Sequence, residues 1–191
     1  VAVGYQALRA LTSGANNTAV GYQAGDALTV GAENVALGSN ALGAEVEGVS
    51  NTAIGYDALK IANAGGSNGA GTTTANTALG TQAGNALATG KFNTFLGAGT
   101  DASANSGENQ TVIGFGATGV ADNSVTLGNA DVTAVYMAQD SGAKVHTAGV
   151  VTERIENSTN KFYELNGSKA VSNGVTTDLL YVDHSNNYSI T

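Results

Sequence analysis

The chain has 191 residues, of which 27 are glycine and 42% are hydrophobic, and it contains no proline, cysteine or tryptophan. Without cysteine it has neither a disulfide framework nor thiol chemistry, and no apolar run is long enough to predict a membrane span. Fifteen acidic residues against seven basic ones give a formal net charge of −8, which makes nucleic acid a poor partner.

Residues 1–131 contain one motif repeated along the chain. A glycine recurs at intervals of 17, 17, 17, 25, 17 and 17 residues, at Gly4, Gly21, Gly38, Gly55, Gly80, Gly97 and Gly114. Each is preceded by an apolar residue, which is Val3, Val20, Leu37, Ile54, Leu79, Leu96 or Ile113. Most copies open on asparagine, at Asn17, Asn34, Asn51, Asn76 and Asn93. A fixed period of this size indicates one supersecondary unit stacked on itself.

A second set of glycines marks another bend in each repeat, at Gly14, Gly31, Gly48, Gly65, Gly90 and Gly107. Two corners in 17 residues leave room for two strands of about four or five residues. The segments between the corners are too short for a helix of ordinary length. The sequence therefore predicts an all-β fold, a parallel β-roll or β-solenoid. Turns about 4.8 Å apart would make a rod of roughly 35 Å, with the asparagines stacked as hydrogen-bonded ladders at one corner.

The single interval of 25 residues is explained by an insertion. Eight extra residues, about Gly66 to Thr73, lie between the corner glycines Gly65 and Gly90. Insertions in repeat proteins form loops on one face. We therefore expect the columns on either side to keep their register.

Apolar residues stand in adjacent pairs before the glycine, for example Ala19 with Val20 and Ala53 with Ile54. Because neighbouring strand residues point to opposite faces, this pattern predicts strands buried on both faces. One face can close on the other strand of the same roll, and the second needs an external surface, which copies of the chain would supply. The sequence predicts a homo-oligomer with aligned repeat axes, and the small alanine and glycine residues would fit a crowded shared axis.

The segments NTAVGYQAG from Asn17 and NTAIGYDAL from Asn51 resemble the head repeats of trimeric autotransporter adhesins, the YadA-like parallel β-roll, and similar repeats in phage tail fibres. The resemblance runs from Ala2 to about Asn129 and covers motif, spacing and number of copies. It implies a homotrimer and left-handed coiling of the roll.

Residues 132–191 have a different composition, richer in Lys, Glu, Tyr and Val. The stretches 149–156, 161–165, 168–172 and 175–183 are typical of strands between Asn- and Gly-containing turns. We predict a small β-meander or sandwich domain, incomplete at its C-terminus. A competing 3,4,3,4,3 apolar spacing over 148–165 is typical of a short trimeric coiled coil, although the ENSTN segment in its middle consists of poor helix formers.

Catalytic, cofactor and metal sites are not indicated. Neither His146 nor His184 stands in a motif with metal-ligand spacing, and Asp26, Asp57 and Asp101 fall on different turns instead of forming the paired carboxylates of a glycosidase. We predict that the chain is not an enzyme.

These observations predict a structural and adhesive protein. The first hypothesis is a segment of an extracellular trimeric fibre, a phage or virus tail fibre, that acts as a rigid spacer and attaches to the host by avidity. Its partners would be two further copies, other fibre or virion proteins, and a host surface receptor that is a glycan or a protein. The alternative is a trimeric autotransporter adhesin on a bacterial surface. A fibre-borne polysaccharide-degrading enzyme is a third reading, but it would need clustered carboxylates that turns of this size do not form.

Aromatic and polar residues of the second region are the candidates for receptor binding, because such side chains stack on sugars and fill interface hot spots. They are Phe162, Tyr163, Tyr181, His184 and Tyr188. The competing interpretation makes them the core of a small β domain. The chain starts at Val1 without methionine, inside a repeat, and stops at Thr191 in a strand-like run, so we expect a piece of a longer fibre.

Overall fold

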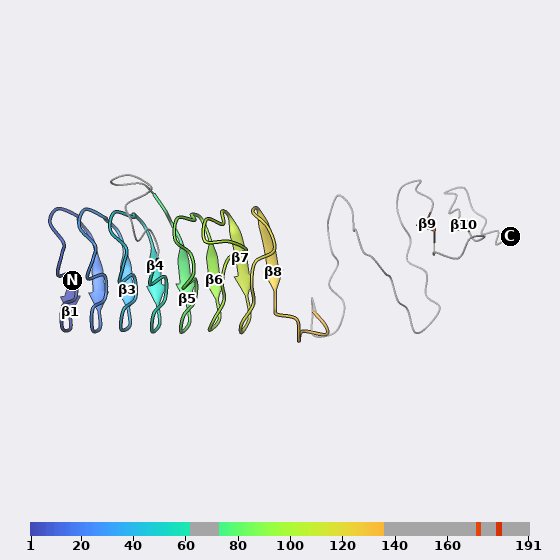
Figure 1. Ribbon diagram of the computed structural model, residues 1–191, viewed down its shortest axis with the longest axis horizontal. Coiled ribbons are helices and arrows are strands. Elements are labelled where there is room, and N and C mark those ends of the chain that lie inside the picture. The colour runs from blue at the N-terminus through green and yellow to red at the C-terminus, as the bar shows by residue number, and fades with distance from the viewer. Residues whose placement is uncertain (62–72, 136–170, 173–178, 181–191) are drawn as a thin grey trace. The chain divides into compact units, whose positions relative to one another are not determined.

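The computed structural model describes residues 1–61, 73–135, 171–172 and 179–180 (Figure 1). Their secondary structure is all-β. The chain divides into two units, Val1–Gly142 and Ala143–Thr191. Composition had placed the boundary at 131/132, four residues after the last strand of the first unit ends at Leu127.

The first unit is a row of stacked turns, each with one short strand on the same side (Figure 1). The strands form one eight-stranded parallel sheet in chain order. They are β1 Ala2–Val3, β2 Thr18–Val20, β3 Val35–Leu37, β4 Thr52–Ile54, β5 Thr77–Leu79, β6 Thr94–Leu96, β7 Gln110–Ile113 and β8 Ser124–Leu127. The predicted parallel β-solenoid is confirmed.

The register of the sheet follows the repeat. Ala19 pairs with Ala36, one 17-residue period on, whereas Thr52 pairs with Thr77 across 25 residues. The extra residues thus leave the columns in line, as predicted. Residues 62–72 themselves lie outside the described part of the chain.

The expectation of two strands of four or five residues in each turn is wrong. Each turn has one strand of two to four residues, and the return side contributes only isolated bridges, such as Lys91 with Glu108. The reason lies in the backbone: residues such as Gln23, with φ of 52°, and Leu42, with φ of 51°, adopt the left-handed conformation in the return segment. A left-handed residue interrupts the extended geometry that a strand requires.

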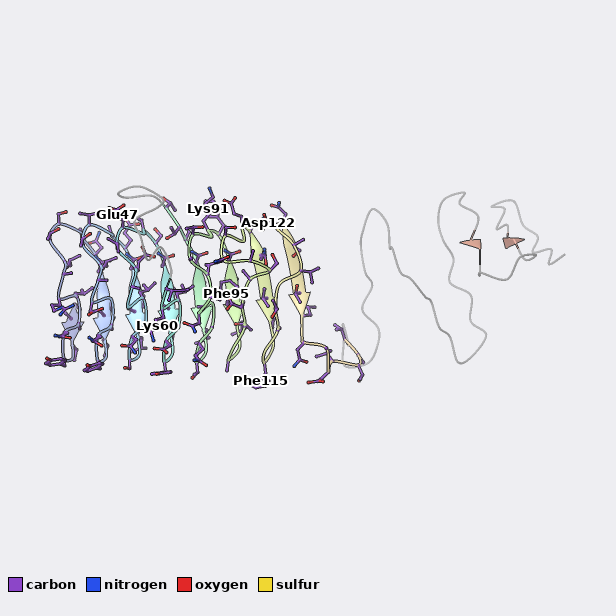
Figure 2. The ribbon with its side chains drawn as sticks, in the orientation of Figure 1. Glu47, Lys60, Lys91, Phe95, Phe115 and Asp122 are labelled. Atoms are coloured by element: carbon purple, nitrogen blue, oxygen red, sulfur yellow. The ribbon has the colours of Figure 1, made fainter. Side chains whose placement is uncertain are left out.

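The core of each turn consists of small and medium apolar side chains. The residues that point inward from β2 to β7 are Ala19, Ala36, Ala53, Ala78, Phe95 and Val112, and all are buried. Leu42, Leu59 and Leu87 fill the space across from the alanines. Where the large Phe95 (Figure 2) replaces an alanine, Gly84 lies beside it, and a Cβ there would be 2.8 Å from the Phe95 ring. Large and small residues therefore compensate each other between turns.

One position of this core holds a carboxylate. Glu45 stands where Leu28 and Leu87 stand in other turns, and it is fully buried. Its Oε1 accepts hydrogen bonds from the backbone N–H of Gly48 at 2.6 Å and of Glu47 at 3.3 Å.

The glycine that follows each strand is required by the backbone of the single chain. The backbone angle φ lies between 123° and 142° in Gly4, Gly21, Gly38, Gly55, Gly80, Gly97 and Gly114. A Cβ on Gly80 would lie 2.6 Å from the carbonyl carbon of Gly97 in the next turn. The predicted reason for the small residues was a crowded axis shared between copies. For the alanines it is wrong, because they are buried in the core of one roll, and for the glycines it stays a prediction, since the crowding seen here lies between turns of one roll.

The asparagine column forms the buried ladder that the sequence predicted. The backbone N–H of Asn34 donates to Asn17 Oδ1 at 3.0 Å, and Asn34 Nδ2 donates to the carbonyl of Gly48 at 2.8 Å. The same bonds recur through Asn76 and Asn93, and Gln110 takes over the position in β7. With the exception of Asn51, each asparagine of the ladder thus satisfies backbone groups of two turns.

In the second unit the described residues are β9 Val171–Ser172 and β10 Leu179–Leu180, which pair antiparallel. Antiparallel pairing suits a meander. The rest of the predicted meander or sandwich, and the competing coiled coil at 148–165, lie outside the described residues, so both stay predictions.

Candidate functional site

The outward face of the eight-stranded sheet has two columns. Because side chains alternate along a strand, the residues on either side of the buried alanine point outward. The first, which we call the threonine column, is Thr18, Val35, Thr52, Thr77, Thr94, Thr111 and Val125. The second, the aliphatic column, is Val3, Val20, Leu37, Ile54, Leu79, Leu96, Ile113 and Leu127.

Five members of the aliphatic column are exposed in the single chain, and Val20, Ile54 and Ile113 are half-buried. Leu37, Leu79 and Leu96 are 44%, 47% and 43% exposed, and Leu127 is 46% exposed. None of the eight strands contains a charged residue. A continuous uncharged sheet face with a row of exposed aliphatic groups is typical of a surface that another protein covers.

A third column consists of the residue directly after the glycine that follows each strand, and we call it the aromatic edge. It is Tyr5, Tyr22, Ser39, Tyr56, Thr81, Ala98 and Phe115. Tyr5, Tyr22, Tyr56 and Phe115 are 66%, 52%, 51% and 78% exposed. Figure 2 shows Phe115 at the tip of the turn that follows β7. The rings of Tyr5 and Tyr22 stack, with their centroids 5.5 Å apart and an interplanar angle of 13°.

Polar side chains accompany the aromatic edge. The next residue in each turn adopts the left-handed conformation and carries an amide or a carboxylate at Gln6, Gln23, Asn40, Asp57 and Gln82. Gln23 Nε2 donates to Gln6 Oε1 at 2.9 Å, and Asn40 Nδ2 donates to Asp57 Oδ1 at 2.9 Å. These bonds join turns in pairs along the edge.

The three aspartates Asp26, Asp57 and Asp101 each bond to groups of their own turn or of the preceding one. Asp26 Oδ2 lies 3.2 Å from Arg9 Nη2, and the buried Asp57 has its Oδ2 3.2 Å from Lys60 Nζ. Asp101 accepts the backbone N–H groups of Ala86 and Ala102, both at 2.9 Å. No cluster of three or more His, Cys, Asp or Glu residues suited to a metal ion occurs in the described part of the chain.

Two carboxyl groups have shifted pKa values. Burial raises the pKa of Asp101, and its two backbone hydrogen bonds act against that shift. The pKa of Asp122 is lowered, first by the backbone N–H of Glu108 and then by the amide of Gln110. The two groups therefore respond to acid in opposite directions.

The predicted receptor-binding residues, Phe162, Tyr163, Tyr181, His184 and Tyr188, lie outside the described residues. Sequence reasoning missed the aromatic edge. Its signal was the Gly-Tyr pair at Gly4–Tyr5, Gly21–Tyr22 and Gly55–Tyr56, which recurs in only part of the repeats.

Comparison with family models, curated proteins and solved structures finds no match for this chain. Among the described residues there is no helix with the length and apolar character needed to cross a membrane.

Proposed function

We propose that this chain is a segment of a homotrimeric fibre, a phage or virus tail fibre, which serves as a rigid spacer and attaches to the host surface. The observation that carries the proposal is the uncharged outward face of the sheet, with its aliphatic column exposed in the single chain. The parallel β-solenoid itself is compatible with a structural or adhesive role.

A second copy of the chain is the partner that fits this face. Any partner must offer apolar groups at the same turn spacing along the whole sheet, and another roll does so by construction. Burying the exposed half of Val3, Leu37, Leu79, Leu96 or Leu127 contributes about 1 kcal/mol for each side chain. Summed over these five side chains in every chain of an assembly, this burial opposes the entropy lost on association.

The three-fold count and the extracellular location rest on the resemblance of the repeats to trimeric adhesin heads and fibre repeats. In such an assembly a weak binding site is present three times on one rod, so attachment gains by avidity. The role of Phe162, Tyr163, Tyr181, His184 and Tyr188 as receptor contacts belongs to this proposal.

Cysteine cross-linking tests the interface directly, because the chain has no cysteine of its own. Leu79→Cys places a thiol on the aliphatic column, and the matched control Ala86→Cys places one at an exposed position in the same turn but away from the sheet. With a short bismaleimide, we expect Leu79→Cys to give covalent dimers, leaving the third chain of each trimer unlinked, while Ala86→Cys remains monomeric on a denaturing gel. Equal yields from the two variants would show that the sheet face is not the contact.

A further inference from the structure

We propose that the aromatic edge contains a binding slot for a neutral sugar ring, between Tyr22 and Tyr56 and above Ser39. The inference deepens the attachment role and rests on the proposed function, since the sugar would belong to a glycan of the host surface. It adds a contact on the roll to those predicted in the second unit.

The first step is the orientation of the rings. Tyr5 and Tyr22 occupy equivalent places in successive turns and stack at 5.5 Å with nearly parallel planes. Their ring faces therefore look along the roll, toward the neighbouring turns. One face of Tyr22 is covered by Tyr5, and the other looks toward the turn of Ser39, whose side chain is too small to cover it.

The second step is the distance to the next ring. Tyr56 follows two turns after Tyr22 and leaves a backbone of the same conformation, since Gly21 and Gly55 both have φ of 138°. Two turn spacings amount to roughly 10 Å. A ring placed midway is about 5 Å from each aromatic centre, within the usual range for stacked rings. The gap above Ser39 therefore fits one six-membered ring with two apolar faces.

The third step concerns polar atoms around the gap. Gln23 and Asn40 each use the amide nitrogen for a hydrogen bond to a neighbouring turn, at Gln6 and Asp57 respectively. Among the described residues no hydrogen bond uses Gln23 Oε1, Asn40 Oδ1 or the hydroxyl of Ser39, and none joins Gln23 to Asn40. These oxygens can accept hydrogen bonds from ligand hydroxyls. Stacking faces with a few polar atoms at their rim are what a pyranose ring needs.

The fourth step is charge. Asp57 is 5% exposed and paired with Lys60, so its charge is compensated where it adjoins the slot. Asp26 is compensated in the same way by Arg9. Among the described residues no unpaired cation adjoins the slot, while the chain as a whole carries −8. This balance favours a neutral sugar over an acidic one.

The test uses the full chain and four probes, the methyl pyranosides of glucose, galactose, mannose and N-acetylglucosamine, observed by saturation-transfer NMR at millimolar concentration. We expect at least one of them to bind the wild type. Tyr22→Ala and Tyr56→Ala each remove one wall, and Ser39→Tyr fills the slot while extending the Tyr5–Tyr22 stack, so that it should not lower the melting temperature. Each should weaken binding at least tenfold. The control Phe115→Ala, which removes an exposed ring of the aromatic edge outside the slot and outside the Tyr5–Tyr22 stack, should bind as the wild type does.

The slot is disproved if none of the four sugars receives saturation from the wild type, or if Ser39→Tyr binds as well as the wild type. Light scattering on the same samples keeps this outcome separate from the proposed function. A trimer without sugar binding contradicts the slot alone, and a monomer that binds sugar contradicts the fibre alone.

Discussion

The glycine that follows each strand is constrained in two ways, by its backbone and by the space around it. Gly80 has φ of 142°, which side-chain-bearing residues rarely adopt, and a Cβ would meet the backbone of Gly97. Gly99, in contrast, has φ of 66° and no atom within 3.7 Å of its would-be Cβ. Other turns carry Asn40 or Gln23 at the place of Gly99, so the left-handed conformation alone is tolerated there.

Gly80→Ala should therefore destabilise the roll strongly. We expect a loss of about 3 kcal/mol or more in the free energy of unfolding, because strained φ and a backbone collision act together. The control is Gly99→Asn, which should change stability by less than about 1 kcal/mol. Chemical denaturation of both variants followed by circular dichroism measures the difference, and a Gly80→Ala variant as stable as Gly99→Asn would refute the role given to the glycine column.

Asp101 and Asp122 should give the roll two opposite responses to acid. The folded-state pKa of Asp101 is raised by burial from its ordinary value near 3.8, so its charged form destabilises the fold and this cost disappears as the pH falls through the raised pKa. The folded-state pKa of Asp122 is lowered by its hydrogen bonds, so its stabilising effect is present above 3.8 and is lost as the pH falls through the lowered pKa.

Asparagine variants separate the two responses, because asparagine does not titrate. On acidification from pH 7, the wild type should gain stability relative to Asp101→Asn, starting above pH 3.8, and lose stability relative to Asp122→Asn below that value. Urea denaturation at a series of pH values measures both differences. Parallel slopes for the two variants would contradict the assignment of burial to one and hydrogen bonding to the other.

At the scale of the element, each turn is held by its asparagine as well as by its strand. A strand of three residues makes few ladder bonds, whereas Asn76 alone bonds the backbone of Gly90 and Asn93. Asn51 is the exception, since its Nδ2 has no hydrogen-bond partner among the described residues. The corner glycine that would accept this bond, by analogy with Gly48 and Gly90, is Gly65 beside the insertion, outside the described residues.

Deleting residues 66–73 should restore a uniform period and leave the roll intact. The regular bond pattern is already present after the insertion, where Ala75 N–H donates to the carbonyl of Val49 at 3.1 Å, as Phe92 N–H does to Thr74. The change in loop-closure free energy should be below about 0.6 kcal/mol, the amount for a doubling of loop length. Thermal unfolding followed by circular dichroism tests this, and a loss of cooperative melting would show that the insertion is part of the fold.

At the scale of the whole molecule, the sequence predicted the parallel stack, its register and the asparagine ladder, because all three follow from a strict period. It did not predict the single strand per turn, because glutamine and leucine rarely adopt the left-handed backbone that Gln23 and Leu42 have here. It did not predict the aromatic edge, because only some of the turns carry an aromatic residue after the glycine. The alanines, expected at an axis shared between copies, lie in the core of one roll, because a repeat does not distinguish contacts within a chain from contacts between chains.

The outward face of the sheet links the fold to its proposed role. The core inside each roll is already closed by alanine, leucine and Phe95, so the exposed aliphatic column is not needed for the packing of the single chain. Its aliphatic character from Val3 to Leu127 is what supports the proposed partner with the same period.

The mass of the full chain in solution tests this account most directly. Sedimentation equilibrium at neutral pH and moderate salt should give a single species of three times 18.8 kDa, with a melting temperature that rises with protein concentration because unfolding and dissociation are coupled. A stable, folded species of 18.8 kDa with a concentration-independent melting temperature would contradict it.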